Sequence, residues 1–167
     1  MIIRIRIRRR ASGARFVHPM DPVPRTAILS RGFEETKMVR VFPRGWDREA
    51  ARFRPTSIAA PVERLRSLVQ AGLRLEHAVI AFTYQGQAVL SHADRDLFWR
   101  AFGVPVFEQY LGRNNELLAT ECDAHSGLHV VAGCSDLRLE PEPCPCGDRT
   151  PRLARGFRVE ELVELLA

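Results

Sequence analysis

Four cysteines and two histidines lie close together in the chain, and their side chains are those that bind transition metals. The members of this group are Cys122, His125, His129, Cys134, Cys144 and Cys146. A tetrahedral zinc site needs four such ligands, which usually come as two local pairs because each pair fixes two positions at little loop-closure cost. The residue types therefore predict a structural Zn²⁺ site.

Cys144 and Cys146 form one local pair, with Pro145 between them and Gly147 after them. The proline stiffens the spacing, and the glycine allows the tight backbone that follows. A disulfide between these two cysteines would close a strained ring, and nothing in the sequence points to an oxidising compartment. Both sulfur atoms are therefore expected to be available to a metal.

The second pair depends on a predicted β-hairpin. Leu117–Cys122 and Leu128–Val131 are typical of two strands joined by a turn over Asp123–Gly127. In such a hairpin Cys122 and His129 are diagonal neighbours, roughly 7–8 Å apart at the backbone. That separation lets both side chains reach one metal ion.

We therefore expect the four metal ligands to be Cys122, His129, Cys144 and Cys146. Two reserves remain, because His125 at the loop tip could replace His129 and Cys134 could replace either member of the hairpin pair. A catalytic zinc ion would need an open position and a nearby carboxylate, which Glu121 could supply. The structural site is the preferred interpretation.

The elements that must position these ligands begin with a strand, a helix and a second strand. Ala78–Tyr84 is an almost continuous apolar run, which indicates a buried strand. A helix is predicted to begin at Ser91 with a capping-box-like pattern and to end before Gly103. Val106–Leu111 is the next predicted strand, so the segment forms a βαβ unit with parallel strands.

The remaining elements are predicted from shorter patterns. A helix begins at Pro61, Arg158–Leu166 forms a C-terminal amphipathic helix, and Ile2–Arg8 alternates as a strand does. Ala27–Leu29 and Met38–Phe42 are candidate strands, and residues 43–60 are expected to be a loop or a short helix. The predicted fold class is α/β: a small βαβ core with a zinc-stabilised β-hairpin and a C-terminal helix.

Two parts of the chain differ in charge. The 167-residue chain has a net charge of +5 and contains a single lysine, Lys37. Most of the excess arginine lies in residues 1–60, which we separate as a basic N-terminal segment with short strands. Residues 61–167 form the α/β domain that contains the zinc-binding segment 122–146.

The sequence contains neither a membrane span nor a signal peptide, so a cytoplasmic protein is expected.

The basic segment supports an alternative function. Its aromatic side chains are interleaved with arginines between Arg40 and Arg54. Such interleaving can bind single-stranded nucleic acid by stacking and phosphate contact, although an arginine-rich protein with a small core would show it too. Nucleic acid is thus one candidate partner.

Three pieces of the chain resemble the phenylacetate–CoA ligase family of adenylate-forming enzymes. The pieces are Ala101–Tyr110, Leu118–Val130 and Cys144–Leu153, within a resemblance that covers about residues 94–156. Some members of that family bind zinc with the matching cysteines and histidine. The resemblance implies the same four ligands as the spacing does.

The chain departs from that family where adenylation chemistry would occur. Leu-Gly-Arg-Asn-Asn follows Tyr110 in place of the family's Gly-x-Thr-Glu, and no lysine follows Lys37. We therefore expect a zinc-binding accessory module without adenylation activity, whose partner is a full-length adenylate-forming enzyme or a second copy. The alternative is a compact acyl-activating enzyme, with Tyr110, Arg113 and Glu116 as candidate ligand-binding residues.

Overall fold

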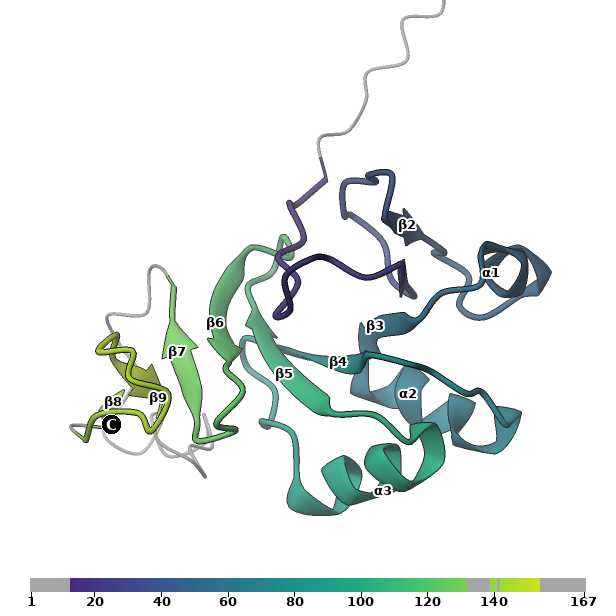
Figure 1. The fold of residues 1–167 in the computed structure, drawn as a ribbon. Helices are drawn as coiled ribbons and strands as arrows, with labels where there is room; N and C mark the ends of the chain where they lie inside the picture. Colours follow the sequence, from purple (N-terminus) through teal and green to yellow (C-terminus); the bar gives the residue numbers. More distant parts are fainter. Residues whose placement is uncertain (1–12, 132–138, 141, 154–167) are drawn as a thin grey trace, which may run out of the picture.

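The computed structural model describes residues 13–131, 139–140 and 142–153 as a mixed α/β fold (Figure 1). Nine strands form one sheet in the order β2-β1-β3-β4-β5-β6-β7-β9-β8. The predicted strand Ile2–Arg8 and the predicted C-terminal helix Arg158–Leu166 lie outside the described residues. No helix in the described part of the chain is long and apolar enough to cross a membrane.

The first half of the sheet is parallel. Its strands are β1 (Thr26–Ile28), β2 (Val39–Val41), β3 (Ser57–Pro61), β4 (Ala78–Tyr84) and β5 (Val106–Leu111). β4 and β5 are buried on both faces, and β4 is almost wholly apolar, as is typical of a covered parallel strand. β5 also contains the buried Glu108, which accepts hydrogen bonds from Thr83 Oγ1 and the Leu90 amide. These two strands form the centre of the molecule.

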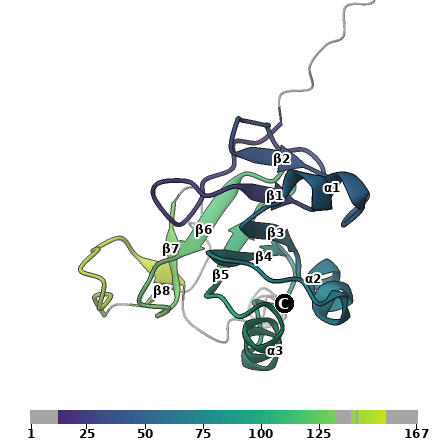
Figure 2. The ribbon, with the colours of Figure 1, turned by 45° about the vertical axis from the view of Figure 1, so that its right-hand side comes forward.

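The helices connect the parallel strands. They are α1 (Arg48–Phe53), α2 (Val62–Leu68) and α3 (His92–Phe102), with a 3-10 turn, η1, over Val69–Ala71. Their side chains Ala50, Leu65 and Phe98 share one core cluster with strand residues, so all three helices cover the same face (Figure 2). The connections from β2 to β3, β3 to β4 and β4 to β5 all run in the same direction across the sheet. Because crossovers between parallel strands are right-handed, their helices lie on the same face.

The other face of the parallel strands is covered by the chain that precedes β1 and by the β1–β2 connection. Phe16 and Phe33 pack there against Phe82 of β4, with the Phe33 and Phe82 rings stacked at 5.2 Å. Both faces of the central strands are therefore sealed from water by apolar side chains.

The start of α3 follows the predicted cap. Ser91 Oγ accepts a hydrogen bond from the Asp94 amide at 3.1 Å, and Gly103 ends the helix with a φ of 72°. Asp94 also accepts two hydrogen bonds at 2.8 Å from Arg66 of α2. The helix cap thereby ties α3 to α2.

The second half of the sheet is antiparallel. Its strands are β6 (Leu117–Glu121), β7 (Leu128–Val130), β8 (Leu139–Glu140) and β9 (Arg152–Leu153). β6 and β7 form the predicted hairpin, with Thr120 opposite His129. The polypeptide after β7 returns as β9 to pair with it, which brings distant parts of the sequence to the hairpin.

The predicted βαβ unit is confirmed, with β4 and β5 at the predicted bounds and parallel. The predicted core contained only the βαβ unit, whereas β1, β2 and β3 extend the same sheet beyond β4. β3 was missed within residues 43–60, since its sequence Ser-Ile-Ala-Ala-Pro is rich in small residues and gives a weak apolar pattern. The boundary drawn at residue 60 falls inside β3.

Candidate metal centre

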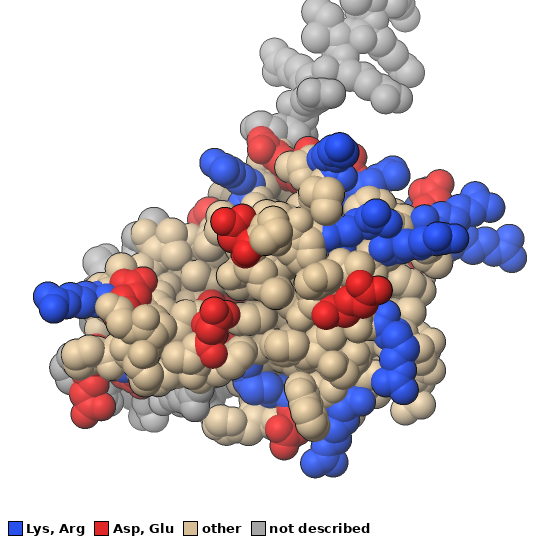
Figure 3. Space-filling model, viewed as in Figure 1, with Lys and Arg blue, Asp and Glu red and all other residues tan. Residues whose placement is uncertain are grey.

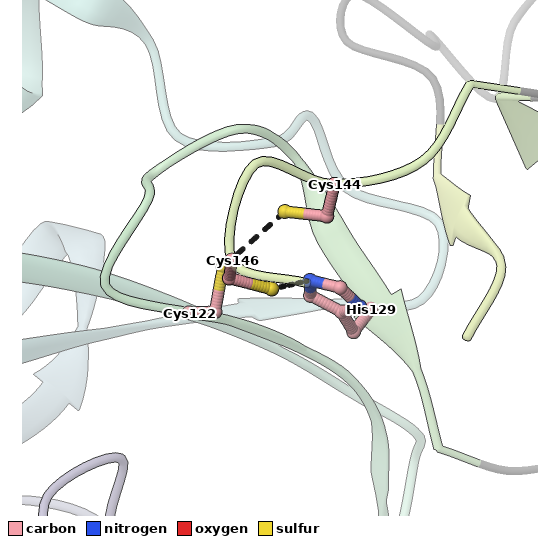
Figure 4. A group of neighbouring side chains, drawn as sticks. All are labelled: Cys122, His129, Cys144 and Cys146. Atoms are coloured by element: carbon pink, nitrogen blue, oxygen red, sulfur yellow. Dashed lines mark hydrogen bonds between the residues drawn. The ribbon is translucent and has the colours of Figure 1, made fainter. Parts of the chain in front are cut away.

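Four potential metal ligands converge beside the β6–β7 hairpin. They are Cys122, His129, Cys144 and Cys146 (Figure 4). Cys122 directly follows β6, and His129 lies in the middle of β7. The segment between β8 and β9 contributes the other two cysteines. The ligand atoms of all four lie within 4.8 Å of one another, so together they could hold a metal ion.

The hairpin register explains why Cys122 and His129 meet. Thr120 is paired with His129, so Cys122, two residues further along, is the diagonal neighbour of His129. Side chains on alternate residues of a strand share a face, which directs both groups to the same side of the hairpin. This is the arrangement that the sequence spacing predicted.

The Cys144–Cys146 turn supplies the other two sulfur atoms. The Gly147 amide donates a hydrogen bond to the Cys144 carbonyl at 3.0 Å, and Gly147 has a φ of 87°. The Asp148 amide points toward Cys146 Sγ at 3.4 Å. A glycine is favoured here because the turn needs a left-handed backbone immediately after the second cysteine.

Two contacts link the hairpin pair to the turn pair. Cys122 Sγ and Cys144 Sγ are 3.6 Å apart, and Cys146 Sγ is 3.5 Å from His129 Nε2. The three described cysteines are free thiols. The imidazole therefore presents Nε2 to the sulfur atoms and keeps Nδ1 for other partners.

The second nitrogen of His129 is hydrogen-bonded on the far side of the ring. Nδ1 lies 2.8 Å from Thr150 Oγ1 and 3.8 Å from the Asp148 carboxylate, while the Thr150 amide donates to that carboxylate at 2.8 Å. Such partners fix the orientation and tautomer of a metal-binding imidazole. With the proton on Nδ1, the lone pair of Nε2 faces the cysteines.

The cysteine pKa values move in opposite directions. A hydrogen bond from the Cys146 backbone amide lowers the pKa of Cys144 to about 7. Burial raises the pKa of Cys122 to about 11. Cys144 is therefore more readily deprotonated than Cys122, and a metal that binds the Cys122 sulfur must displace its proton.

Of the two reserve ligands, His125 is not brought to this cluster. His125 adopts a φ of 47° in the hairpin loop, with its ring 4.9 Å from that of Phe107 and its Nδ1 3.5 Å from the Glu121 carboxylate. Cys134 lies outside the described residues. The geometry thus favours His129 over His125 as the histidine ligand.

Glu121 does not face the four ligands either. Its carboxylate accepts a hydrogen bond at 2.9 Å from the Glu108 amide and forms an ion pair at 3.0 Å with Arg95 of α3. Adjacent residues of a strand point to opposite faces, so Glu121 is directed toward α3 while Cys122 is directed toward the cluster. The carboxylate proposed for a catalytic zinc is therefore engaged in joining the hairpin to the helix layer.

A buried arginine braces the hairpin from its other edge. Arg152 of β9 forms an ion pair with Glu140 at 3.1 Å, and its guanidinium donates to the Ser126 carbonyl and, at 2.9 Å, to Ser126 Oγ. It also donates to the Glu142 carbonyl at 2.9 Å. One side chain thus holds β8, the hairpin loop and the segment before Cys144 in register.

The candidate ligand-binding residues Tyr110, Arg113 and Glu116 do not converge. Tyr110 is buried in a cluster with Ala119 and Leu128, whereas Arg113 and Glu116 are exposed. Glu116 accepts a hydrogen bond at 2.9 Å from the Asn114 amide and so stabilises the turn itself. This arrangement corresponds to a hairpin turn between β5 and β6.

Sequence reasoning missed the residues that support the ligands. Thr150 and Asp148 follow the cysteine turn directly, and a Thr or Asp within a few residues of a metal-binding pair is a signal that could have been used. Arg152 carried no comparable signal, because its role depends on the pairing of β9 with β7. Two-residue strands give no detectable periodicity.

Comparison with known proteins adds no assignment to this site. No protein-family model matches the sequence, and no curated protein is significantly similar to it. The interpretation of the site therefore rests on the geometry of its own residues.

Proposed function

We propose that Cys122, His129, Cys144 and Cys146 bind one structural Zn²⁺ ion. The observation that carries this proposal is the convergence of three thiols and one imidazole nitrogen within 4.8 Å of one another. Zinc favours this donor set, and a site with three cysteines and one histidine is a common form of structural zinc site.

The spacing of the ligand atoms supports zinc. With zinc bonds of about 2.3 Å to sulfur and about 2.0–2.1 Å to nitrogen, a tetrahedron separates two sulfurs by about 3.8 Å and a sulfur from a nitrogen by about 3.6 Å. The corresponding contacts here are 3.6 Å and 3.5 Å. Two of the six ligand-atom pairs therefore have nearly tetrahedral spacing, and the other pairs lie within 4.8 Å.

The site suits a structural role better than a catalytic one. Four protein ligands would complete a tetrahedron and leave no position for a reacting water, which a catalytic zinc requires. The nearby Glu121 carboxylate is bonded to Arg95 and to the Glu108 amide. The metal would instead join the turn before β9 to the β6–β7 hairpin.

We further propose that the chain is a binding or accessory module without adenylation activity. The sequence departs from the phenylacetate–CoA ligase family after Tyr110, and the candidate ligand-binding residues Arg113 and Glu116 are exposed in the turn between β5 and β6. The proposed partner is a full-length adenylate-forming enzyme or a second copy of this chain. The resemblance over residues 94–156 is what suggests such a partner.

Replacement of the metal by cobalt tests the site directly. Tetrahedral Co²⁺ bound to thiolates absorbs strongly in the visible, whereas octahedral Co²⁺ absorbs weakly. The metal-free protein is expected to give the tetrahedral spectrum at one equivalent of Co²⁺, and added Zn²⁺ is expected to abolish it. A weak octahedral spectrum throughout the titration would contradict the proposed ligand set.

Calorimetry with ATP tests the absence of adenylation. Titration of the zinc-loaded protein with ATP and with a non-hydrolysable acyl-adenylate analogue is expected to give no binding heat. Tight binding of either compound would contradict the accessory role and favour the compact enzyme. The zinc site could stand in that case, so the two proposals fail separately.

A further inference from the structure

We propose that an arginine-rich surface around α1 binds single-stranded nucleic acid. This surface is named here the α1 arginine patch. It consists of Arg25, Arg40, Arg48, Arg52 and Arg54, all of which are exposed. The proposal is independent of the zinc site, because the patch is formed at the opposite end of the sheet.

The fold collects these arginines from three separate segments. Arg48 and Arg52 lie on α1 and Arg54 is its C-cap, whereas Arg40 lies on the edge strand β2 and Arg25 directly precedes β1. Basic side chains gather on the part of the surface where Figure 1 places α1 and β2 (Figure 3). The fold thus brings arginines from three segments to one region of the surface, where they outnumber the acidic side chains.

The positive charge of the patch is not balanced by ion pairs. Within the described part of the chain, none of its five guanidinium groups lies in a salt bridge. By contrast, Arg66, Arg95 and Arg152 elsewhere each pair with a carboxylate. The nearby carboxylate of Asp47 accepts two amide hydrogen bonds at the start of α1. The exposed Glu49 also lies on α1, but the five arginines outnumber these two carboxylates, and a surface of net positive charge attracts a polyanion.

Two of the guanidinium groups are held against one aromatic ring. The Cζ atoms of Arg25 and Arg40 lie 6.0 and 5.7 Å from the centre of the half-buried Phe53 ring. The Arg40 guanidinium also lies 5.9 Å from the Phe42 ring. These contacts order the guanidinium groups before any ligand arrives, so less side-chain entropy is lost on binding.

Arg54 occupies a backbone conformation that favours glycine. Its φ of 50° and ψ of 57° place it in the left-handed region at the end of α1. Glycine or asparagine is the usual residue at such a helix end, because a Cβ atom is unfavourable there. An arginine at this position therefore adds positive charge to the surface, although its backbone conformation is unfavourable.

The combination of charge and planar groups favours nucleic acid over other anions. Guanidinium groups bind phosphates through paired hydrogen bonds, and their exposed planes can stack on bases. An acidic peptide would use the charge but not the stacking surfaces. Single strands present unstacked bases, so they fit the patch better than a duplex does.

The test measures the binding of a fluorescent 20-nucleotide single strand to the full chain at several salt concentrations. Five phosphate contacts predict a slope of about −3.5 in log K against log salt, which corresponds to about a 100-fold loss of affinity between about 50 and 200 mM salt. DNA and RNA strands are measured in separate arms, because the phosphate chemistry is common to both. No binding at low salt would overturn the proposal.

A double variant localises the binding. In Arg48→Gln/Arg54→Gly the slope is expected to fall to about −2.1, since each lost contact removes about 0.7. The Arg54→Gly change relieves the left-handed backbone, so the melting temperature is not expected to fall and weaker binding cannot be attributed to unfolding. The matched control Arg74→Gln/Arg100→Gln removes two exposed arginines elsewhere and is expected to keep the full slope.

Competition experiments compare a single strand with a duplex and with polyglutamate. An unlabelled single strand is expected to displace the probe at concentrations at least tenfold below those required for a duplex of equal length or for polyglutamate of equal charge. Equal competition by polyglutamate would show that the patch recognises charge alone and would overturn the nucleic-acid proposal. An equal effect of the two double variants on binding would also overturn it.

Discussion

At the residue scale, neighbouring side chains of the β6–β7 hairpin have different functions because they lie on opposite faces. Glu121 joins β6 to α3 through Arg95, whereas Cys122 belongs to the four-residue cluster that could hold a metal ion. The two histidines of this hairpin also have different surroundings, because His129 lies within β7 and His125 lies within the loop. Substitutions at these positions can therefore distinguish ligands from neighbours.

The two histidines provide a matched pair of variants. His129→Gln is expected to weaken zinc affinity by at least 10-fold, because it removes a ligand whose Nε2 lies 3.5 Å from Cys146 Sγ. His125→Gln is expected to leave the affinity unchanged, since its ring packs on Phe107. Competition with a chromophoric chelator measures both affinities. The reverse order would identify His125 as the ligand.

His18 predicts how acid destabilises the protein. Burial lowers its pKa from 6.5 to about 4, while the Met20 amide donates to its Nδ1 at 3.0 Å. Because the folded pKa lies below the unfolded one, the neutral ring stabilises the fold above pH 6.5, and this stability is lost as the pH falls toward about 4.

Urea unfolding between pH 7 and pH 4 tests this expectation. In His18→Gln the loss of unfolding free energy over that interval is expected to be smaller than in the wild type, because the titrating group is absent. His92→Gln is the control, since His92 is exposed at the start of α3. If all three proteins lose stability equally between pH 7 and pH 4, His18 does not contribute in this way.

At the element scale, α3 is held by apolar burial and by its cap. Phe98 is fully buried against the parallel strands, whereas Trp99, the next residue, is 60% exposed. Phe98→Ala is expected to lower the free energy of unfolding by about 3–5 kcal/mol. Trp99→Ala is the control and is expected to change it by less than about 0.5 kcal/mol. Chemical denaturation measures both, and equal losses would contradict the packing described.

The elements that the sequence predicted best are those with strong local signals. The apolar run of β4, the cap at Ser91 and the Gly103 exit of α3 all determined their elements correctly. β3 and β9 were missed because their residues are small or few, and their formation depends on pairing with strands distant in the sequence. The convergence of Cys122 and His129 was predictable because it depends on one hairpin alone.

At the scale of the whole molecule, one sheet joins two regions of different character. The parallel strands have helices on one face and the N-terminal segment on the other, while β7, β8 and β9 are short strands at the far end. Only two residue pairs connect β7 to β9. Stability in that end of the sheet is expected to depend on the metal ligands and on Arg152.

Hydrogen exchange with and without a chelator tests this division. Removal of zinc is expected to accelerate exchange of the amides in β7 and β9, because the turn that joins them loses its anchor. The amides of β3 and β4 are expected to exchange at unchanged rates, since these strands pack in core clusters that contain no residue of β7 or β9. Uniform acceleration across the sheet would contradict a local structural role for the metal.

The presence of zinc in the native protein is the central claim. The most direct measurement is a native mass spectrum of the protein purified without a metal-affinity step, followed by a spectrum of the denatured protein. One zinc ion per chain is expected in the native spectrum, with none after denaturation and none in Cys144→Ser. A native protein that carries no metal and retains four free thiols would contradict the account.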